Sequence, residues 1–380
     1  MRPPNEEGLR DYGAGREWSW PREPLLYLTD LHADPDALRR SLERAGHAGE
    51  RVVLGGDLID KGPDDLGLLD EVAALRARAP VELLLGNHDL RFLLALHALE
   101  REDPTTAHLP VRLGRKGLGL LRALYRAAGS PSPASRPKVA RRRLLPGRGW
   151  PEEFARRAPG LGLSGAALQR ELGRARRKEE ALRAELDHGE DFGWGELEAA
   201  LELARAWFLD PAGRYAWLAT ESRFAWEAGA FLFVHAGLCD EGAALAGEGG
   251  AAALEARYQE LRLEDPGRLY FGPLGNALRT KYRPAIDAAL GAKGAAALRA
   301  RGVHALVTGH RPGPAPRLAL YGGVLHVDGD ACLDRVSRAQ RQLPLEGAGG
   351  VWLRPDGSLE LVGDAATVRL EARRLGWQLV

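Results

Sequence analysis

The segment that most constrains the fold of this chain is GGDLIDKGP, at residues 55–63. A short apolar run at residues 51–54 precedes it, and the glycines Gly55 and Gly56 end that run. This pattern is typical of a buried strand that delivers Asp57 at its C-terminal end. Ligands of α/β sheets bind at the carboxyl ends of the strands. The segment therefore predicts an α/β fold with a functional site around Asp57.

Two other strand candidates end in polar side chains of a related kind. Residues 25–29 are followed by Asp30 and His32, and residues 81–85 are followed by Asn87 and His88. Carboxylate, amide and imidazole groups suit divalent Mn, Fe, Zn or Mg better than a soft thiolate site would. Three strands that each end in such groups predict a metal site.

Helical patterns separate these three strands. Asp34 and Pro35 supply a helix start, and apolar residues recur at helical spacing until residue 45. A second helical pattern opens at Pro63 and runs to residue 75. Two such units in succession predict parallel strands joined by right-handed crossovers. Further strand candidates lie at residues 230–234, 303–307, 318–321, 324–327, 350–353 and 358–362.

The pattern divides the chain into four parts. Residues 1–24 form a polar N-terminal tail, residues 25–100 the first half of a core, residues 101–225 a mainly helical insertion, and residues 226–380 the second half of the core. Within the insertion, residues 164–187 alternate Glu and Arg as a solvated helix does. The basic stretch at residues 136–148, with its prolines and glycines, predicts a solvated loop.

Composition excludes several classes of protein. A net charge of +1 gives no overall preference for nucleic acid or membrane, so we expect neither as a partner. The N-terminus lacks the apolar core of a signal peptide, and no later segment is long and apolar enough to span a membrane. Cys239 and Cys332 are too few for a disulfide scaffold and predict small buried thiols. We therefore expect a cytoplasmic protein.

The order D-x-H, G-D-x-x-D and G-N-H-D resembles the calcineurin-like metallophosphoesterase superfamily. Two later blocks of that family are also present, VHAG at residues 234–237 and TGH at residues 308–310. The pattern is most similar to the phosphoprotein phosphatase and dinucleoside tetraphosphatase branches. The resemblance implies an α/β fold in which two mixed β-sheets pack face to face and are flanked by helices.

The resemblance also implies two divalent metal ions, manganese among the candidates, and a hydroxide that bridges them. Such a pair of ions supplies the nucleophile and neutralises phosphoryl charge. Asp57 would bridge the ions. Pro312 stands where many members of the superfamily carry one more histidine, so the first ion would depend on fewer side chains. The family's motif blocks, matched to this sequence, imply the ligands of each ion. They are Asp30, His32 and Asp57 for the first ion, and Asp57, Asn87, His235 and His310 for the second.

Four further residues receive catalytic roles from the same resemblance. His88 would orient or protonate the leaving group, and Asp60 would raise the pKa of His88 as its carboxylate partner. Lys61 stands where phosphoprotein phosphatases usually carry Arg, and it would offset phosphoryl charge without the bidentate geometry of Arg. Arg279 is the first choice for a further phosphate contact. His326 ends a strand near the site, and its role stays open between ligand and core residue.

The leading functional hypothesis is a metal-dependent phosphatase that hydrolyses phosphate monoesters, with phosphoserine and phosphothreonine as candidate substrates. The alternative is a hydrolase of dinucleoside polyphosphates. That alternative predicts aromatic residues that stack bases at the mouth of the site, and Trp150, Phe192 and Trp194 of the insertion are the candidates. A scaffold without activity is the third hypothesis, and the complete ligand blocks argue against it.

Overall fold

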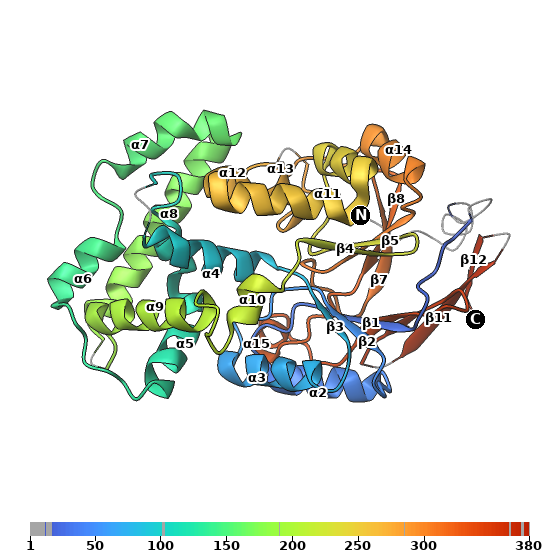
Figure 1. Cartoon of the computed structure of the whole chain (residues 1–380), viewed down its shortest axis with the longest axis horizontal. Coiled ribbons are helices and arrows are strands. Elements are labelled where there is room, and N and C mark those ends of the chain that lie inside the picture. Colours follow the sequence, from blue (N-terminus) through green and yellow to red (C-terminus); the bar gives the residue numbers. More distant parts are fainter. Residues whose placement is uncertain are drawn as a thin grey trace.

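The computed structural model describes residue 12 and residues 17–100, 103–189, 191–284, 286–364, 366–373 and 376–379. Its strands form a seven-stranded sheet in the order β12-β11-β10-β9-β1-β2-β3 and a five-stranded sheet in the order β4-β5-β6-β8-β7 (Figure 1). The strands are Leu25–Leu28 (β1), Arg51–Leu54 (β2), Val81–Leu83 (β3), Ala225–Ala228 (β4), Phe231–Val234 (β5), Ala305–Thr308 (β6), Arg317–Tyr321 (β7), Val324–Asp328 (β8), Gly350–Leu353 (β9), Ser358–Val362 (β10), Thr367–Arg373 (β11) and Gly376–Leu379 (β12).

The helices precede, separate and cover these strands. They are Pro35–Arg44 (α2), Asp65–Arg76 (α3), Asn87–Ala98 (α4), Leu109–Ala127 (α5), Pro137–Leu144 (α6), Trp150–Arg157 (α7), Gly165–Leu186 (α8), Trp194–Phe208 (α9), Ala216–Thr220 (α10), Asp240–Glu264 (α11), Pro266–Phe271 (α12), Pro273–Ala277 (α13), Ala292–Ala300 (α14) and Arg335–Gln340 (α15), with a 3-10 turn at Ala158–Leu161. None of the described helices is both long and apolar enough to cross a membrane.

The first half of the core consists of parallel strands, as the sequence predicts. β1 pairs with β2 and β2 with β3 in parallel, while β9 pairs with β1 antiparallel. The side chain of Asp34 caps α2 by accepting a hydrogen bond from the amide of Ala37 at 3.1 Å. In the second sheet β5, β6 and β8 are parallel, and β4 and β7 are antiparallel edge strands. Both sheets are therefore mixed.

The two sheets pack face to face through alternate residues of their strands. Leu25 and Tyr27 of β1 point into the layer between the sheets, where the ring of Tyr27 lies 5.8 Å from that of Phe233 on β5. Leu26 and Leu28 point to the other face, which α2 and α3 cover. On the far side α11 and α14 cover the second sheet (Figure 1). The predicted fold class, a two-sheet α/β sandwich flanked by helices, is confirmed.

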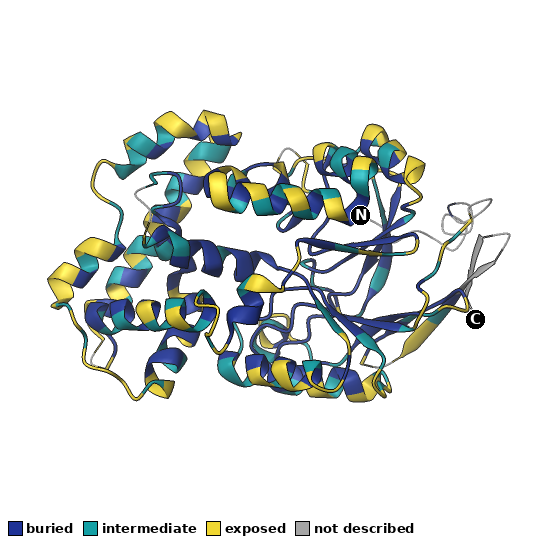
Figure 2. Ribbon diagram, viewed as in Figure 1, coloured by how far each residue is buried: buried dark blue, intermediate teal, exposed yellow. Residues whose placement is uncertain are grey.

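The segment between α4 and β4 contains helices and no strand among its described residues, α5 to α10. These helices gather at the left of Figure 1, away from β11 and β12. The apolar sides of α5, α6, α8, α9 and α10 are continuous with the core cluster that holds α2, α3 and α4, whereas Phe154 of α7 belongs to a separate small cluster. The buried stretches in Figure 2 run across the insertion and the sandwich. The ring of Phe208 at the end of α9 lies 5.0 Å from Phe92 on α4 and 5.3 Å from Tyr215. The insertion therefore packs as part of one body, while its boundaries at residues 101 and 225 stay a proposal.

Two local expectations were wrong or incomplete. The basic stretch at residues 136–148 is not a loop over its whole length, because α6 begins with Pro137 in the first turn and buries Ala140 and Leu144. Proline is tolerated there since the first amides of a helix have no partner within it. The strands β11 and β12 were not predicted.

The N-terminal tail is described only at residue 12 and from residue 17 onward. There the rings of Trp18 and Trp20 lie 5.5 Å and 5.0 Å from that of Phe231 on β5. Cys239 and Cys332 are free and buried, as predicted.

A core substitution tests whether the insertion and the sandwich unfold as one body. Phe208→Ala should lower the free energy of unfolding by about 3–5 kcal/mol, because it removes a fully buried ring from the contact between α9 and α4. Denaturant unfolding followed by circular dichroism and by tryptophan fluorescence should give a single, shifted transition. Val139→Ala on α6, whose side chain is 50% exposed, is the control and should shift it little. A second transition for the insertion alone would contradict the shared core.

Candidate metal centre

The ends of five strands or their neighbouring turns deliver the predicted ligands to one place. Asp30 follows β1, Asp57 follows β2, Asn87 begins α4 after β3, His235 follows β5 and His310 follows β6. With the exception of His235, which is fully buried, these residues and His32 line a cavity of about 230 Å³. The structure therefore brings all six predicted ligands together.

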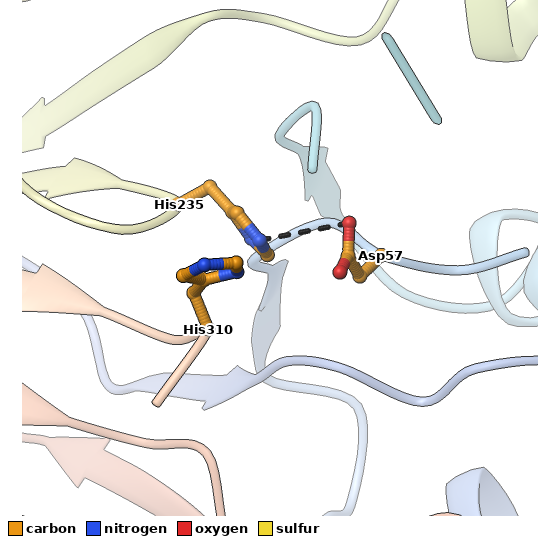
Figure 3. Close-up of side chains that lie close together, drawn as sticks. All are labelled: Asp57, His235 and His310. Atoms are coloured by element: carbon orange, nitrogen blue, oxygen red, sulfur yellow. Dashed lines mark ion pairs between the residues drawn. The ribbon is translucent and has the colours of Figure 1, made fainter. Parts of the chain in front are cut away.

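The Asp57 carboxylate lies between two groups of ligand atoms. On one side, Nε2 of His32 lies 3.6 Å from Oδ2 of Asp57 and 3.7 Å from Oδ1 of Asp30. On the other side, Nε2 of His235 lies 3.5 Å from Oδ1 of Asp57, and His310 stands beside it (Figure 3). The donor atoms of each group, Asp30–His32–Asp57 and Asp57–His235–His310, lie within 4.8 Å of one another. This arrangement suits two cations that share one carboxylate.

Two buried polar atoms support the fit to metal ions. Among the described residues, neither Oδ1 of Asn87 nor Nε2 of His235 has a hydrogen-bond partner. Nδ1 of His235 lies 2.8 Å from the carbonyl of Gly55 and donates to it, which directs the lone pair of Nε2 towards Asp57. A buried polar atom without a partner is costly, and a cation would satisfy both atoms. The residues present therefore fit divalent metal ions.

The charge of Asp57 is strongly favoured. Burial by itself would raise the pKa of Asp57, but the neighbouring His235 and His88 side chains hold it well below its usual value. The amide of His88 also donates to Oδ1 of Asp57 at 2.8 Å. Asp57 is therefore held as a carboxylate, the form that a shared ligand requires.

The backbone at the site occupies an uncommon conformation. Asp30, His32, Asp57 and His310 have φ values of 55°, 44°, 54° and 65°. This left-handed region is disfavoured for residues with a side chain and persists only where the surroundings enforce it. At Gly86 a Cβ would lie 2.1 Å from the amide nitrogen of Asp57, so only glycine allows this approach of the two loops.

Asp89 is the residue that holds the Asp57 loop, and the sequence analysis gave it no role. Its carboxylate accepts hydrogen bonds from the amides of Asp57 at 2.7 Å, Leu58 at 3.1 Å and Gly86 at 2.9 Å. It thereby ties the start of α4 to the loop after β2. Asp89 is the last residue of the G-N-H-D block, and this position was the signal from which its role could have been predicted.

His88 and Asp60 are in contact, as predicted. Nδ1 of His88 donates to Oδ2 of Asp60 at 2.8 Å, and Nε2 of His88 lies 4.0 Å from Oδ2 of Asp57. Arg91, which the sequence analysis did not select, also approaches Oδ2 of Asp60 at 3.3 Å. Burial lowers the pKa of His88 below its usual value, although Asp57 and Asp60 act to raise it. The expected effect of Asp60 on His88 is present, but burial outweighs it.

Three lysines line the same cavity: Lys61, Lys116 and Lys281. The Lys61 ammonium contacts Nε2 of His32. Lys116 comes from α5 of the insertion, and Lys281 from the segment after α13. The sequence analysis missed these two. Their signal was weak, because each stands far along the chain from the motif blocks.

Arg279 does not line this cavity. Its Nε donates to the carbonyl of Gly275 at 3.0 Å, and its guanidinium also contacts the carbonyl of Tyr270. It faces a larger neighbouring cavity instead. Nearby backbone carbonyls therefore bind the Arg279 guanidinium, which was expected to contact the phosphate.

Two other residues near the strand ends, His326 and Asp330, differ in whether they line the cavity. His326 is buried against Tyr282 and Tyr321, with ring centroids 5.3 Å and 4.8 Å away, and it does not line the cavity. Asp330 does line it, and burial together with the charge of Asp30 raises its pKa well above the usual value. Asp330 was not among the predicted residues.

The aromatic residues of the insertion lie away from the mouth of the site. Phe192 and Trp194 are buried in the core, and Trp150 packs on His108 with ring centroids 4.7 Å apart. None of the three lines the cavity or its larger neighbour. The expectation that they stack nucleotide bases was wrong, because the apolar faces of α7 and α9 pack inward.

Comparisons with known proteins agree with the motif blocks. The sequence model of the calcineurin-like phosphoesterase family matches residues 23–131. A symmetrical bis(5'-nucleosyl)-tetraphosphatase of Buchnera aphidicola is 34% identical over 74 residues, which cover 19% of this chain and 26% of that protein. The corresponding protein of Edwardsiella ictaluri is 35% identical over 88 residues, 23% of this chain and 31% of that protein. The matched part thus spans about a quarter to a third of these relatives.

Solved structures give weaker likenesses. A cold-active protein-tyrosine phosphatase of a Shewanella species aligns over 97% of this chain and 84% of its own, at 13% identity and a TM-score of 0.41. A metallophosphoesterase from Sphaerobacter thermophilus aligns over 94% and 88%, at 13% identity and a TM-score of 0.29. At such low TM-scores these likenesses carry no argument about fold or activity.

The role of Asp89 can be tested without measuring catalysis. Asp89→Asn should lower the free energy of unfolding by about 1–3 kcal/mol, because an amide oxygen replaces only part of the carboxylate and its NH₂ group faces backbone donors. Chemical denaturation measures the change. Asp191→Asn, at an exposed position, is the matched control and should change little. Equal stability of the two variants would show that Asp89 does not hold the loop.

Proposed function

We propose that this chain is a metal-dependent phosphatase of the calcineurin-like phosphoesterase family that hydrolyses phosphate monoesters, and the match of residues 23–131 to the model of that family supports the proposal. The observation that carries the proposal is the convergence of Asp30, His32, Asp57, Asn87, His235 and His310 around one cavity. Phosphoserine and phosphothreonine are among the proposed substrates.

The proposed ligands divide into two groups that share Asp57. Two divalent cations bound there, with Mn, Fe, Zn and Mg as candidates, would supply a nucleophile at neutral pH and neutralise phosphoryl charge. The anionic Asp57 would keep them close together despite their repulsion. Asn87 would contribute its amide oxygen, which has no hydrogen-bond partner among the residues that the structure describes.

We assign to His88 the transfer of a proton to the leaving group. Its Nδ1 is engaged by Asp60, so Nε2 is the nitrogen that faces the cavity. Asp60 fixes the orientation of the ring, and Arg91 on the same carboxylate keeps Asp60 in place. In its imidazolium form His88 would carry a second proton on Nε2 and would pass it to the departing oxygen when the ester bond breaks, which leaves the neutral ring with its proton on Nδ1.

The lysines favour a monoester as substrate. A terminal phosphate carries up to two negative charges, whereas a diester carries one. Lys61, Lys116 and Lys281 approach the cavity from three different segments, and each can offset charge on the non-bridging oxygens as a point charge. Their number and placement suit the more highly charged group.

Dinucleoside polyphosphates are the second candidate substrate class. The curated relatives that match part of this chain are named symmetrical tetraphosphatases. The larger cavity beside the metal centre, of about 530 Å³, adds room for a nucleotide. These observations support the alternative without displacing the monoester.

We also propose a cytoplasmic location. The free thiols of Cys239 and Cys332 support a reducing compartment as the site of action.

A substrate panel with a ligand variant tests the proposed function. After treatment with a chelator, the protein should hydrolyse an aryl phosphate only when Mn, Mg, Zn or Fe is added, and a phosphodiester more slowly. Asp57→Asn should lose metal and reduce turnover by at least about 10²-fold. Replacing a residue that merely orients a metal ligand already costs up to about 10²-fold in activity, and Asp57 is proposed as a ligand itself. Asp191→Asn is the control. A phosphopeptide and a dinucleoside tetraphosphate complete the panel. Unchanged metal content and rate in Asp57→Asn would contradict the shared-ligand assignment.

A second pair of variants separates proton transfer from metal binding. His88→Asn should keep its metal content but slow esters with poor leaving groups by about 10²–10⁴-fold, because these need the proton most. The loss should be smaller for an aryl phosphate. Asp60→Asn should show the same dependence more weakly, since the ring loses its orienting carboxylate and keeps its proton. Metal loss, or equal slowing of good and poor leaving groups, would show that His88 is not the acid.

A further inference from the structure

A larger cavity adjoins the metal centre and opens from it. It has a volume of about 530 Å³ and shares Asn87, Lys281 and His310 with the smaller cavity. One wall is a face of α8 in the insertion, and the other is the segment from α12 to residue 288. We name it the arginine groove after its lining residues Arg112, Arg170, Arg174 and Arg279. Its volume falls in the range of roughly 300–1,000 Å³ that is typical of small-molecule sites.

The acidic residues of the groove are mostly engaged. Glu171 forms an ion pair with Arg112 at 2.9 Å and a contact with His108 at 3.3 Å. Burial would raise the pKa of Glu171, but His108 and Arg112 lower it to about 2. On the other wall Asp287 pairs with Arg283 at 2.9 Å. The groove therefore keeps an excess of positive charge.

Arg170 and Arg174 have no ion pair or hydrogen bond within the part of the chain that the structure describes. They stand one turn apart on α8, and both are exposed to the groove side. Like charges four residues apart weaken a helix. Burial lowers the pKa of Arg279; Tyr270 and Glu171 oppose this shift, while the positive charges of Arg112 and Arg174 add to it. An anion in the groove would relieve this repulsion.

The groove also offers apolar surface. Leu163, Phe271, Pro273 and Ile286 line it, and the side chain of Ile286 is 50% exposed. A ligand that matches both features has an anionic group for the arginines and an organic body for the apolar wall. Since the groove is continuous with the metal centre, one molecule can reach both.

We propose that the arginine groove binds a second phosphate group of the substrate, while the first phosphate is hydrolysed at the metal centre. The natural substrate is then a small organic molecule that carries at least two phosphate groups separated by an apolar or planar body. The inference rests on the proposed phosphatase function. It assigns the recognition of the substrate to α8 of the insertion.

Alkanediol bisphosphates test this inference against alkyl monophosphates of the same chain length. With metal-loaded protein, kcat/KM should be about 10- to 100-fold higher for the best bisphosphate than for its monophosphate, since hydrogen bonds to charged groups are worth that much. The advantage should depend on the number of carbons between the phosphates. In Arg170→Gln/Arg174→Gln the ratio of the two kcat/KM values should fall by a similar factor, mainly through KM of the bisphosphate.

Arg176→Gln/Arg177→Gln is the matched control, because these exposed arginines lie on the same helix and outside the groove. It should retain the wild-type ratio. If the wild-type protein hydrolyses neither compound, the proposed function fails. If it hydrolyses both equally, or if the two double variants behave alike, the phosphatase stands and the groove proposal is wrong. The last substrate in the test is a phosphoserine peptide rich in acidic residues. If Arg170→Gln/Arg174→Gln lowered kcat/KM for that peptide alone, and not for the bisphosphate, the proposal would also be overturned. Circular dichroism verifies that both variants are folded.

Discussion

The shared carboxylate of Asp57 is the constraint on which the rest of the site depends. Each of its oxygens faces a different group of ligand atoms, so the strands on both sides of β2, together with β5 and β6 of the second sheet, must end at one point. To reach this position the backbone at Asp57 adopts a left-handed conformation, which is disfavoured for a residue with a side chain. The four amides that donate to the Asp89 carboxylate, and the close approach that only Gly86 permits, keep it there.

The insertion takes part in the same constraint. α5 packs on the start of α3, where a Cβ on Gly119 would lie 3.7 Å from the Asp65 carboxylate, in van der Waals contact. Oδ1 of Asp65 in turn accepts the amide of Asp60 at 2.8 Å, so the insertion supports the partner of His88. The same helix brings Lys116 into the cavity. The insertion, which the sequence predicts as a segment added to the core, is therefore structurally part of the site.

Short-range signals in the sequence predicted strands that end in Asp, Asn or His, because apolar runs report both the strands and their ends. The two-sheet sandwich and the set of six ligands were implied by the resemblance of these blocks to the calcineurin-like metallophosphoesterases. Contacts between distant segments could not be predicted in this way. Lys116 and Lys281 reach the cavity only through the packing of α5 and of the segment after α13. Arg279 failed for the opposite reason, since nearby carbonyls of its own segment engage it. The amphipathic pattern of α9 likewise does not tell which side Trp194 faces.

Charge is distributed unevenly between the two cavities, and the distribution has a consequence for binding. The metal centre combines the carboxylates of Asp30 and Asp57 with the ammonium groups of three lysines, so negative and positive side chains offset one another there until cations bind. The arginine groove is positive without any cation, and the two cavities share Lys281. Because charges interact over about 10 Å at 0.1 M salt, an anion in the groove lies within the field of the metal centre. A substrate held by the groove would therefore be aligned by arginines that need no metal, while the reaction itself would depend on the cations.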